Sequence, residues 1–266
     1  MYAALRKSPP MHWISEWFAL IHLCAAMLVL VLSPSANLIP HRKILAWHLY
    51  RNTAPVLVGF SLLCAVVTVV ITRIVLVTAQ SYGLSTYALE VVVRVLVLEL
   101  IPLAAAIFVA LRCTIPASAE LYRLRTSVPT DRSAASNNFL AINRLQAEVL
   151  PRAFAGMFAG ITLCALSCVV TLVSAYLVGY GFSVSGLTHF TRIFGQVFSP
   201  AVSLIFCCKA TFFSIAVALV PMASSLLDGH SSANTDLRAS GEVRALVRMF
   251  VLVLLIEIAS LLGNYY

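Results

Sequence analysis

The sequence predicts an all-α polytopic membrane protein, with an N-terminal interfacial helix followed by five transmembrane helices. Two observations indicate this fold class. Only 11% of the 266 residues are charged and 61% are hydrophobic, with a mean hydropathy of +0.96, whereas a soluble domain carries about 25% charged residues. The apolar residues also gather in long stretches, five of which come close to or exceed the ~20 residues that cross a bilayer as a helix.

The formal net charge of +8 comes mostly from arginine, with 15 Arg against 3 Lys. No part of the chain is free enough of apolar segments to form a nucleic-acid-binding domain, so we expect no nucleic-acid partner. We assign the basic excess to cytoplasmic loops, because such loops of membrane proteins are enriched in Lys and Arg.

The first apolar stretch, residues 17–32, is short for a membrane span. Basic residues lie on both sides of it, namely Arg6, Lys7, Arg42, Lys43 and Arg51. Because both flanks prefer the cytoplasm, residues 1–54 are expected to form a cytoplasmic and interfacial helix. A true crossing by this stretch is the alternative.

Five further apolar segments predict the transmembrane helices, which we place at about residues 55–79, 88–111, 153–178, 194–220 and 243–262. The short loops 80–87 and 179–191 hold no Lys and no Arg. The N-terminal region and loops 112–152 and 224–248 hold nearly all the basic residues. This distribution predicts a cytoplasmic N-terminus and an external C-terminus. We interpret residues 1–266 as one domain, in which 55–266 form the five-span part and about 113–150 form a cytoplasmic segment.

Glu99 lies inside the second predicted span, three residues before Pro102. A carboxylate at that depth costs about 2.5–3.5 kcal/mol on insertion scales, so it needs a partner or a water-filled surrounding. Arg94 is five residues away and therefore about 140° around the helix, whereas Glu90 and Arg94 share one face. The partner of Glu99 is thus expected on another helix or in solvent.

Two further charges lie inside predicted spans, Lys209 near the middle of the fourth and Glu257 in the fifth. A Glu99–Lys209 or a Lys209–Glu257 pair that fixes the register of the helices would explain them structurally. For Arg94, a side chain that reaches the membrane interface is the simpler explanation. These readings compete with a functional role for the same residues.

Gly156 and Gly160 form a GxxxG in the third predicted span, a spacing that lets two membrane helices approach closely. The seven cysteines lie in or beside apolar runs and form no CxxC pair. They are interpreted as small apolar residues, so neither a metal site nor a cofactor in this chain is expected.

Several short motifs resemble those of the MlaE-type permeases, the membrane subunits of ATP-binding-cassette transporters that move phospholipids. Residues 98–103, L-E-L-I-P-L, resemble the family's R-E-L-G-P-L, and 110–112, A-L-R, resemble its A-G-R. Residues 117–121, A-S-A-E-L, and 150–152, L-P-R, resemble two further family motifs, the second at the start of the third span. The chain departs from the pattern at Ile101, Val128 and Pro129, as expected of a divergent member.

The resemblance implies a permease subunit of the bacterial inner membrane that moves phospholipid or a related lipid. It implies a second permease protomer, identical or different, a cytoplasmic ATPase that binds the ATP, and a periplasmic MCE-type lipid-binding protein. The chain has no GxxxxGK[ST] phosphate-binding loop of its own, so it is not expected to be an enzyme.

The same resemblance proposes roles for individual residues. Candidates for the polar lining of a lipid cavity are Glu99, Lys209, Glu257 and Arg94, with Pro102 as a hinge. Residues 117–125 are the candidate ATPase-coupling helix, through Glu120, Arg123 and Arg125, although a basic segment that rests on anionic lipid would look similar. Gly156 and Gly160 are the candidates for helix packing.

Other classes of function remain as alternatives. A non-transporting membrane scaffold would need no ATPase contact. An ion-coupled secondary transporter would use Glu99 or Glu257 to carry protons, although such folds usually show internal repeats. A membrane-embedded enzyme is disfavoured, because the sequence holds no HExxH and no GxSxG.

Overall fold

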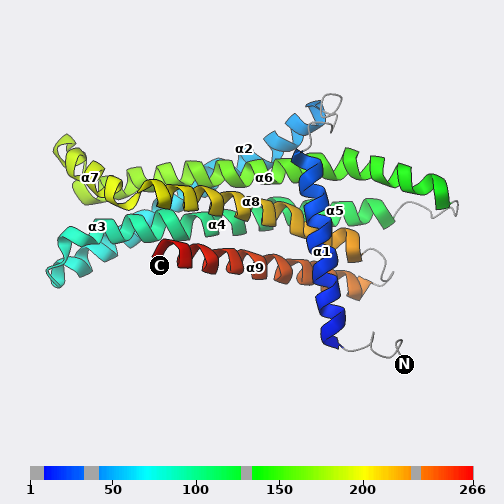
Figure 1. The fold of residues 1–266 in the computed structure, drawn as a ribbon. Coiled ribbons are helices and arrows are strands. Elements are labelled where there is room, and N and C mark those ends of the chain that lie inside the picture. The colour runs from blue at the N-terminus through cyan, green and yellow to red at the C-terminus, as the bar shows by residue number, and fades with distance from the viewer. Residues whose placement is uncertain (1–8, 33–41, 127–133, 229–234, 266) are drawn as a thin grey trace.

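The computed structural model describes residues 9–32, 42–126, 134–228 and 235–265, and every regular element in these ranges is a helix. Five helical segments are long and apolar enough to cross a membrane, in agreement with the predicted all-α fold with five spans. They are Thr53–Ser81, Tyr87–Glu120, Val149–Tyr180, Pro200–Ser224 and Val243–Asn264. Turns without Lys or Arg join α2 to α3 and α6 to α7 at the end of the bundle away from α1 (Figure 1).

Helix α1 (Pro9–Leu32) crosses the bundle at a steep angle instead of running along it (Figure 1). Its apolar part, Trp17–Val29, is shorter than the candidate spans. It packs against α8 and α6, with Leu20 and Met27 buried. This geometry fits the interfacial helix predicted for this segment, because such a helix lies in the plane of the membrane surface.

The second span is one continuous helical path that changes its winding twice. It consists of α3 (Ser85–Val93), η2 (Arg94–Leu100), α4 (Ile101–Val109), η3 (Ala110–Thr114) and α5 (Ile115–Thr126), of which η2 and η3 are π-helical. An Ile-Pro pair follows each π-helical stretch directly, Ile101-Pro102 and Ile115-Pro116. A proline inside a helix lacks a donor and its ring clashes with the carbonyl four residues earlier. A wider turn before each proline relieves that clash.

The third span belongs to α6 (Ala134–Tyr180), a single helix of 47 residues that contains Pro151. Residues 150–152 stand at the start of the candidate span Val149–Tyr180, as predicted, although the helix itself begins 17 residues before Pro151. The point where charged residues stop along the sequence marks where a helix enters the membrane. A helix that begins in water has its first residue in polar sequence, where no such signal exists.

The fourth span begins later than predicted. Residues 194–197 belong to a separate helix, α7 (Leu187–Val197), and the span itself starts with α8 (Pro200–Asp228). Proline disfavours helical backbone in the residue before it, which explains the break. Ser199 caps α8, since its Oγ accepts a hydrogen bond from the Val202 N–H at 3.3 Å. The predicted loop 179–191 accordingly holds the short helix η4 (Val184–Gly186) and the start of α7.

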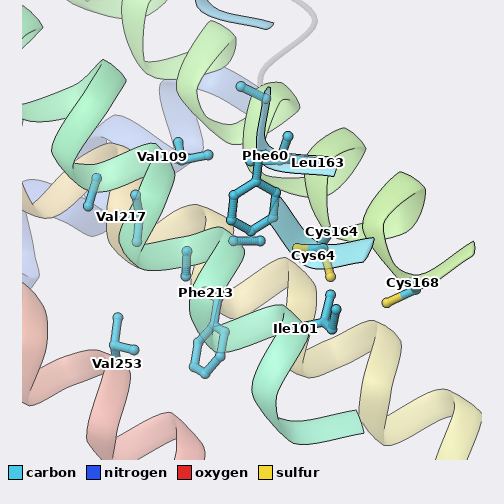
Figure 2. Close-up of a cluster of buried hydrophobic side chains, with 14 of the residues drawn as sticks. Phe60, Cys64, Ile101, Val109, Leu163, Cys164, Cys168, Phe213, Val217 and Val253 are labelled. Carbon is cyan, nitrogen blue, oxygen red and sulfur yellow. The ribbon is translucent and has the colours of Figure 1, made fainter. Parts of the chain in front are cut away.

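The apolar core is shared by α2 (Arg42–Ser81), α4, α6, α8 and α9 (Thr235–Tyr265) (Figure 2). Phe60 of α2 packs on Phe108 of α4, with ring centroids 4.8 Å apart. Farther along α2, the buried hydroxyl groups of Thr68 and Thr171 are hydrogen-bonded at 3.3 Å, which joins α2 to α6. Figure 2 shows Cys64 close to Cys164 in this core, which matches the interpretation of these cysteines as apolar packing residues.

Gly156 and Gly160 bring α6 close to α8. A Cβ atom added at Gly156 would lie 3.3 Å from the Cβ of Ala218, and one at Gly160 would lie 2.7 Å from the Oγ of Ser214. Ser214 and Ala218 are four residues apart, so two pairs of small residues face each other across the two helices. The packing role predicted for this GxxxG fits these distances.

Substitution of Gly160 by alanine is expected to destabilise the protein by about 1–3 kcal/mol, because the new methyl group overpacks against Ser214. The measurement is the thermal unfolding midpoint of the purified protein in detergent. Gly59→Ala is the matched control, since a Cβ there meets nothing within 4 Å. The double variant Gly160→Ala/Ser214→Gly should recover most of the loss, and an unchanged midpoint for Gly160→Ala would contradict the close packing.

Candidate functional site: a buried lysine between two carboxylates

Lys209 of α8 is buried between two other helices, with 2% of its surface exposed. Its Nζ donates a hydrogen bond to the carboxylate of Glu99 in η2. It also lies 2.8 Å from Oε2 of Glu257 in α9. Three charges that are distant in sequence, each on a different membrane span, therefore meet at one point, and the partner of Glu99 comes from another helix as predicted.

The backbone of η2 contributes a further ligand to Lys209. Pro102 has no N–H, so it leaves the carbonyls four and five residues earlier, those of Leu98 and Val97, without this backbone donor. Lys209 Nζ donates to the Leu98 oxygen at 3.1 Å. The Val97 oxygen receives the Cys168 thiol of α6, at 3.9 Å from its sulfur. Side chains of neighbouring helices thus occupy the two acceptors that the proline exposes.

Helix α9 adds polar side chains beside Glu257. The amide nitrogen of Asn264 donates to Oε1 of Glu99 at 3.4 Å. Ser260 lies between Glu257 and Asn264 on the same helix, is 8% exposed, and its hydroxyl has no hydrogen-bond partner among the described residues. Glu257, Ser260 and Asn264 share one face, since steps of three and seven residues keep side chains within about 60°.

Electrostatics make Lys209 the central member of this cluster. Taking charges out of water is costly, and their mutual attraction offsets that cost only when the contacts are close. The side chains of Glu99 and Glu257 are 14% and 12% exposed, whereas that of Lys209 is 1% exposed. The ring of Phe213 lies 5.8 Å from Nζ and gives the cation a further favourable contact.

Arg94, the fourth candidate for the polar lining, is paired elsewhere. Its guanidinium lies 3.5 Å from Oε1 of Glu90, the i,i+4 partner that the sequence predicts. Its side chain is 42% exposed. The structure therefore unites three of the four candidate residues and places Arg94 with Glu90 instead of Glu99.

The candidate coupling helix is present as α5 (Ile115–Thr126), which packs against α8 and η3. Glu120 lies 3.8 Å from Arg152 of α6, and its side chain is 58% exposed. The backbone of Arg123 and Arg125 belongs to α5, but their side chains lie outside the described residues, as do Val128 and Pro129 altogether.

The sequence analysis did not single out Ser260, Asn264, Cys168 or the Leu98 carbonyl. For Ser260 and Asn264 a signal existed, since polar residues three and seven positions after a buried glutamate share its helix face. For the Leu98 carbonyl the sequence signal was weaker, namely the proline four residues later. Among the described residues, no group of three His, Cys, Asp or Glu side chains is placed to hold a metal ion.

Five apolar helices around an internal ion cluster define a multi-pass membrane protein with charges inside its helical bundle. Residues 45–262 match the family described as Permease MlaE. The match covers more than half of the chain, so the chain belongs to the MlaE permease family, the permease subunits of ABC lipid transporters. It is thus a transmembrane subunit and not the ATPase. A search of curated proteins gives no match.

Replacement of Lys209 by methionine is expected to cost about 3–5 kcal/mol of stability, because it leaves two carboxylates facing each other without their cation. The thermal unfolding midpoint in detergent is the measurement. Arg94→Met is the control, with an expected effect below about 1 kcal/mol for an exposed pair.

A second variant isolates the charge effect. Lys209→Met combined with Glu99→Gln and Glu257→Gln removes all three charges and should be more stable than Lys209→Met alone. If the triple variant is instead less stable than the single one, the carboxylates do not depend on Lys209.

Proposed function

We propose that the chain moves phospholipid or a related lipid between the two membranes of a bacterial envelope, from a position in the inner membrane. It works with a second permease protomer, identical or different, and with a cytoplasmic ATPase that binds the ATP. A periplasmic MCE-type protein is the expected lipid acceptor or donor on the outer side. The observation that carries this proposal, beyond family membership, is the Glu99–Lys209–Glu257 cluster inside the bundle.

The cluster lies at a depth where a lipid headgroup needs polar contacts. Glu99 is 12 residues after Tyr87, the first residue of the second span, which corresponds to about 18 Å along the helix. Charged residues at such depth commonly mark the path of a polar substrate. Glu99 and Glu257 remain partly exposed, so a headgroup that enters the bundle can reach them.

The second span gives the cytoplasmic end a direct connection to this cluster. The chain passes without a break from η2, which carries Glu99, through α4 and η3 into α5. Pro102 and Pro116 weaken the helix at two places, and Pro102 serves as the hinge in this proposal. A displacement of α5 by the ATPase would move the Leu98 carbonyl relative to Lys209.

Two other functions use the same features. A scaffold would keep the cluster only for stability, and an ion-coupled transporter would move protons on Glu99 or Glu257. Transport in proteoliposomes distinguishes them, with a partner ATPase whose catalytic glutamate is replaced by glutamine. Loss of lipid transfer with that ATPase supports the proposal, and transfer driven by a pH gradient alone supports the ion-coupled alternative.

Glu99→Ala is expected to leave the protein folded, because Lys209 keeps its contacts with Glu257 and the Leu98 oxygen. Lipid transfer should fall at least tenfold, since the polar contact at the hinge is lost. The measurement is transfer of a labelled phospholipid between proteoliposomes and acceptor vesicles. Glu90→Ala, which breaks only the pair with Arg94, is the matched control. Equal loss of membrane accumulation in Glu99→Ala and Lys209→Ala would mean that the residue is structural.

Reversal of charge in α5, Arg123→Glu with Arg125→Glu, is expected to weaken binding of the ATPase. The measurement is the amount of ATPase that co-purifies with the tagged permease. Arg192→Glu on α7 is the control, since α7 lies at the other end of the bundle (Figure 1). Unchanged co-purification would exclude the coupling role and favour contact of these arginines with anionic lipid.

A further inference from the structure

The ammonium of Lys209 has no side left open for a lipid phosphate. It carries three N–H groups, and three oxygens surround it, those of Leu98, Glu99 and Glu257. Its side chain is 1% exposed. The N–H groups of this cation, a candidate for the polar lining of a lipid cavity, are therefore already occupied.

The cluster instead has spare acceptors. Oδ1 of Asn264 has no hydrogen-bond partner among the described residues. The buried hydroxyl of Ser260 also has no hydrogen-bond partner among the described residues. Buried polar atoms are nearly always hydrogen-bonded, so the Asn264 oxygen and the Ser260 hydroxyl together indicate a missing hydrogen-bond partner.

The charge of the cluster points to the same kind of ligand. Two carboxylates and one ammonium carry a formal charge of −1, and the nearby Arg94 is paired with Glu90. An anionic headgroup would add a second uncompensated charge in apolar surroundings, which is costly. A cation with several N–H donors would both balance the charge and bond the spare acceptors.

We infer that the face formed by Glu257, Ser260 and Asn264, beside Glu99, binds the primary ammonium of an aminophospholipid headgroup. This inference rests on the proposed function and names the substrate class of the same site. A quaternary ammonium carries no N–H and leaves the spare acceptors unbonded. A phosphoglycerol headgroup brings hydroxyl donors but also the uncompensated negative charge.

The route to this face runs along α9. Asn264 is the last residue of the fifth span, so the three side chains extend from the end of the span about 10 Å inward to Glu257. Each is about one helical turn from the next. A headgroup that arrives at the outer end of α9 would meet Asn264 first and Glu257 last.

The test is native mass spectrometry of the permease–ATPase complex after reconstitution in nanodiscs that hold equal amounts of phosphatidylethanolamine, phosphatidylglycerol and phosphatidylcholine. We expect about tenfold enrichment of phosphatidylethanolamine among the bound lipids, which corresponds to about 1.4 kcal/mol. The double variant Ser260→Ala/Asn264→Leu should lose most of this enrichment while it still folds and binds the ATPase. The single variant Ser260→Ala should lose part of it.

Ser167→Ala is the matched control, because Ser167 is a buried serine of α6 that lies outside the cluster. Its enrichment should equal that of the unaltered protein. Equal occupancy by the three lipids, preference for phosphatidylglycerol, or full enrichment in the double variant would overturn the inference. Equal occupancy is also the result if water alone fills the face.

Lipid transfer itself, measured apart from headgroup preference, decides the proposed function. Lipid transfer without headgroup preference removes this inference and leaves the proposed function in place. Absence of transfer for all three lipids by the folded, ATP-hydrolysing complex removes both.

Discussion

The contact between Lys209 and the backbone before Pro102 is the interaction on which the centre of this structure depends. A proline in a membrane helix exposes carbonyls, and lipid offers them no hydrogen bond. Here an ammonium from α8 bonds the Leu98 oxygen and two carboxylates neutralise that ammonium. The buried ammonium thus supplies a donor to the irregular backbone, and the backbone oxygen supplies one of the acceptors that the buried ammonium requires. Neither would be stable alone at this depth.

Composition and loop charge were sufficient to predict the five spans, because each span must be apolar over a length fixed by the bilayer. They were insufficient for the helix ends. Helix α6 begins at Ala134, well before its apolar part, and α7 precedes the fourth span as a separate helix. The first boundary lies in polar sequence that carries no hydropathy signal. The second is set by Pro200, a local backbone effect that a hydropathy profile does not contain.

The charges of the candidate site were predictable, and so were the two ion pairs of Lys209 as alternatives, but the remaining contacts were not. A carboxylate buried in a span requires a partner, so Glu99, Lys209 and Glu257 could be identified from their cost alone. Which of them meet depends on the rotation of three helices, and this is decided by packing such as that of Gly156 and Gly160 against α8. The ligand from Leu98 could not be read from a side chain at all, because it is a backbone oxygen.

The two π-helical stretches give the second span a specific mechanical character. Each precedes an Ile-Pro pair, one beside the ion cluster and one where the span continues into α5. Between them, α4 is short and regular, with buried residues such as Ala105 and Val109 packed in the core. A helix that is weakened at both ends of a rigid, well-packed piece bends at the two weak points when one of its ends is displaced. In the proposed coupling, a movement of α5 would change the backbone at Pro102, and the hydrogen bond from Lys209 to the Leu98 oxygen would change with it.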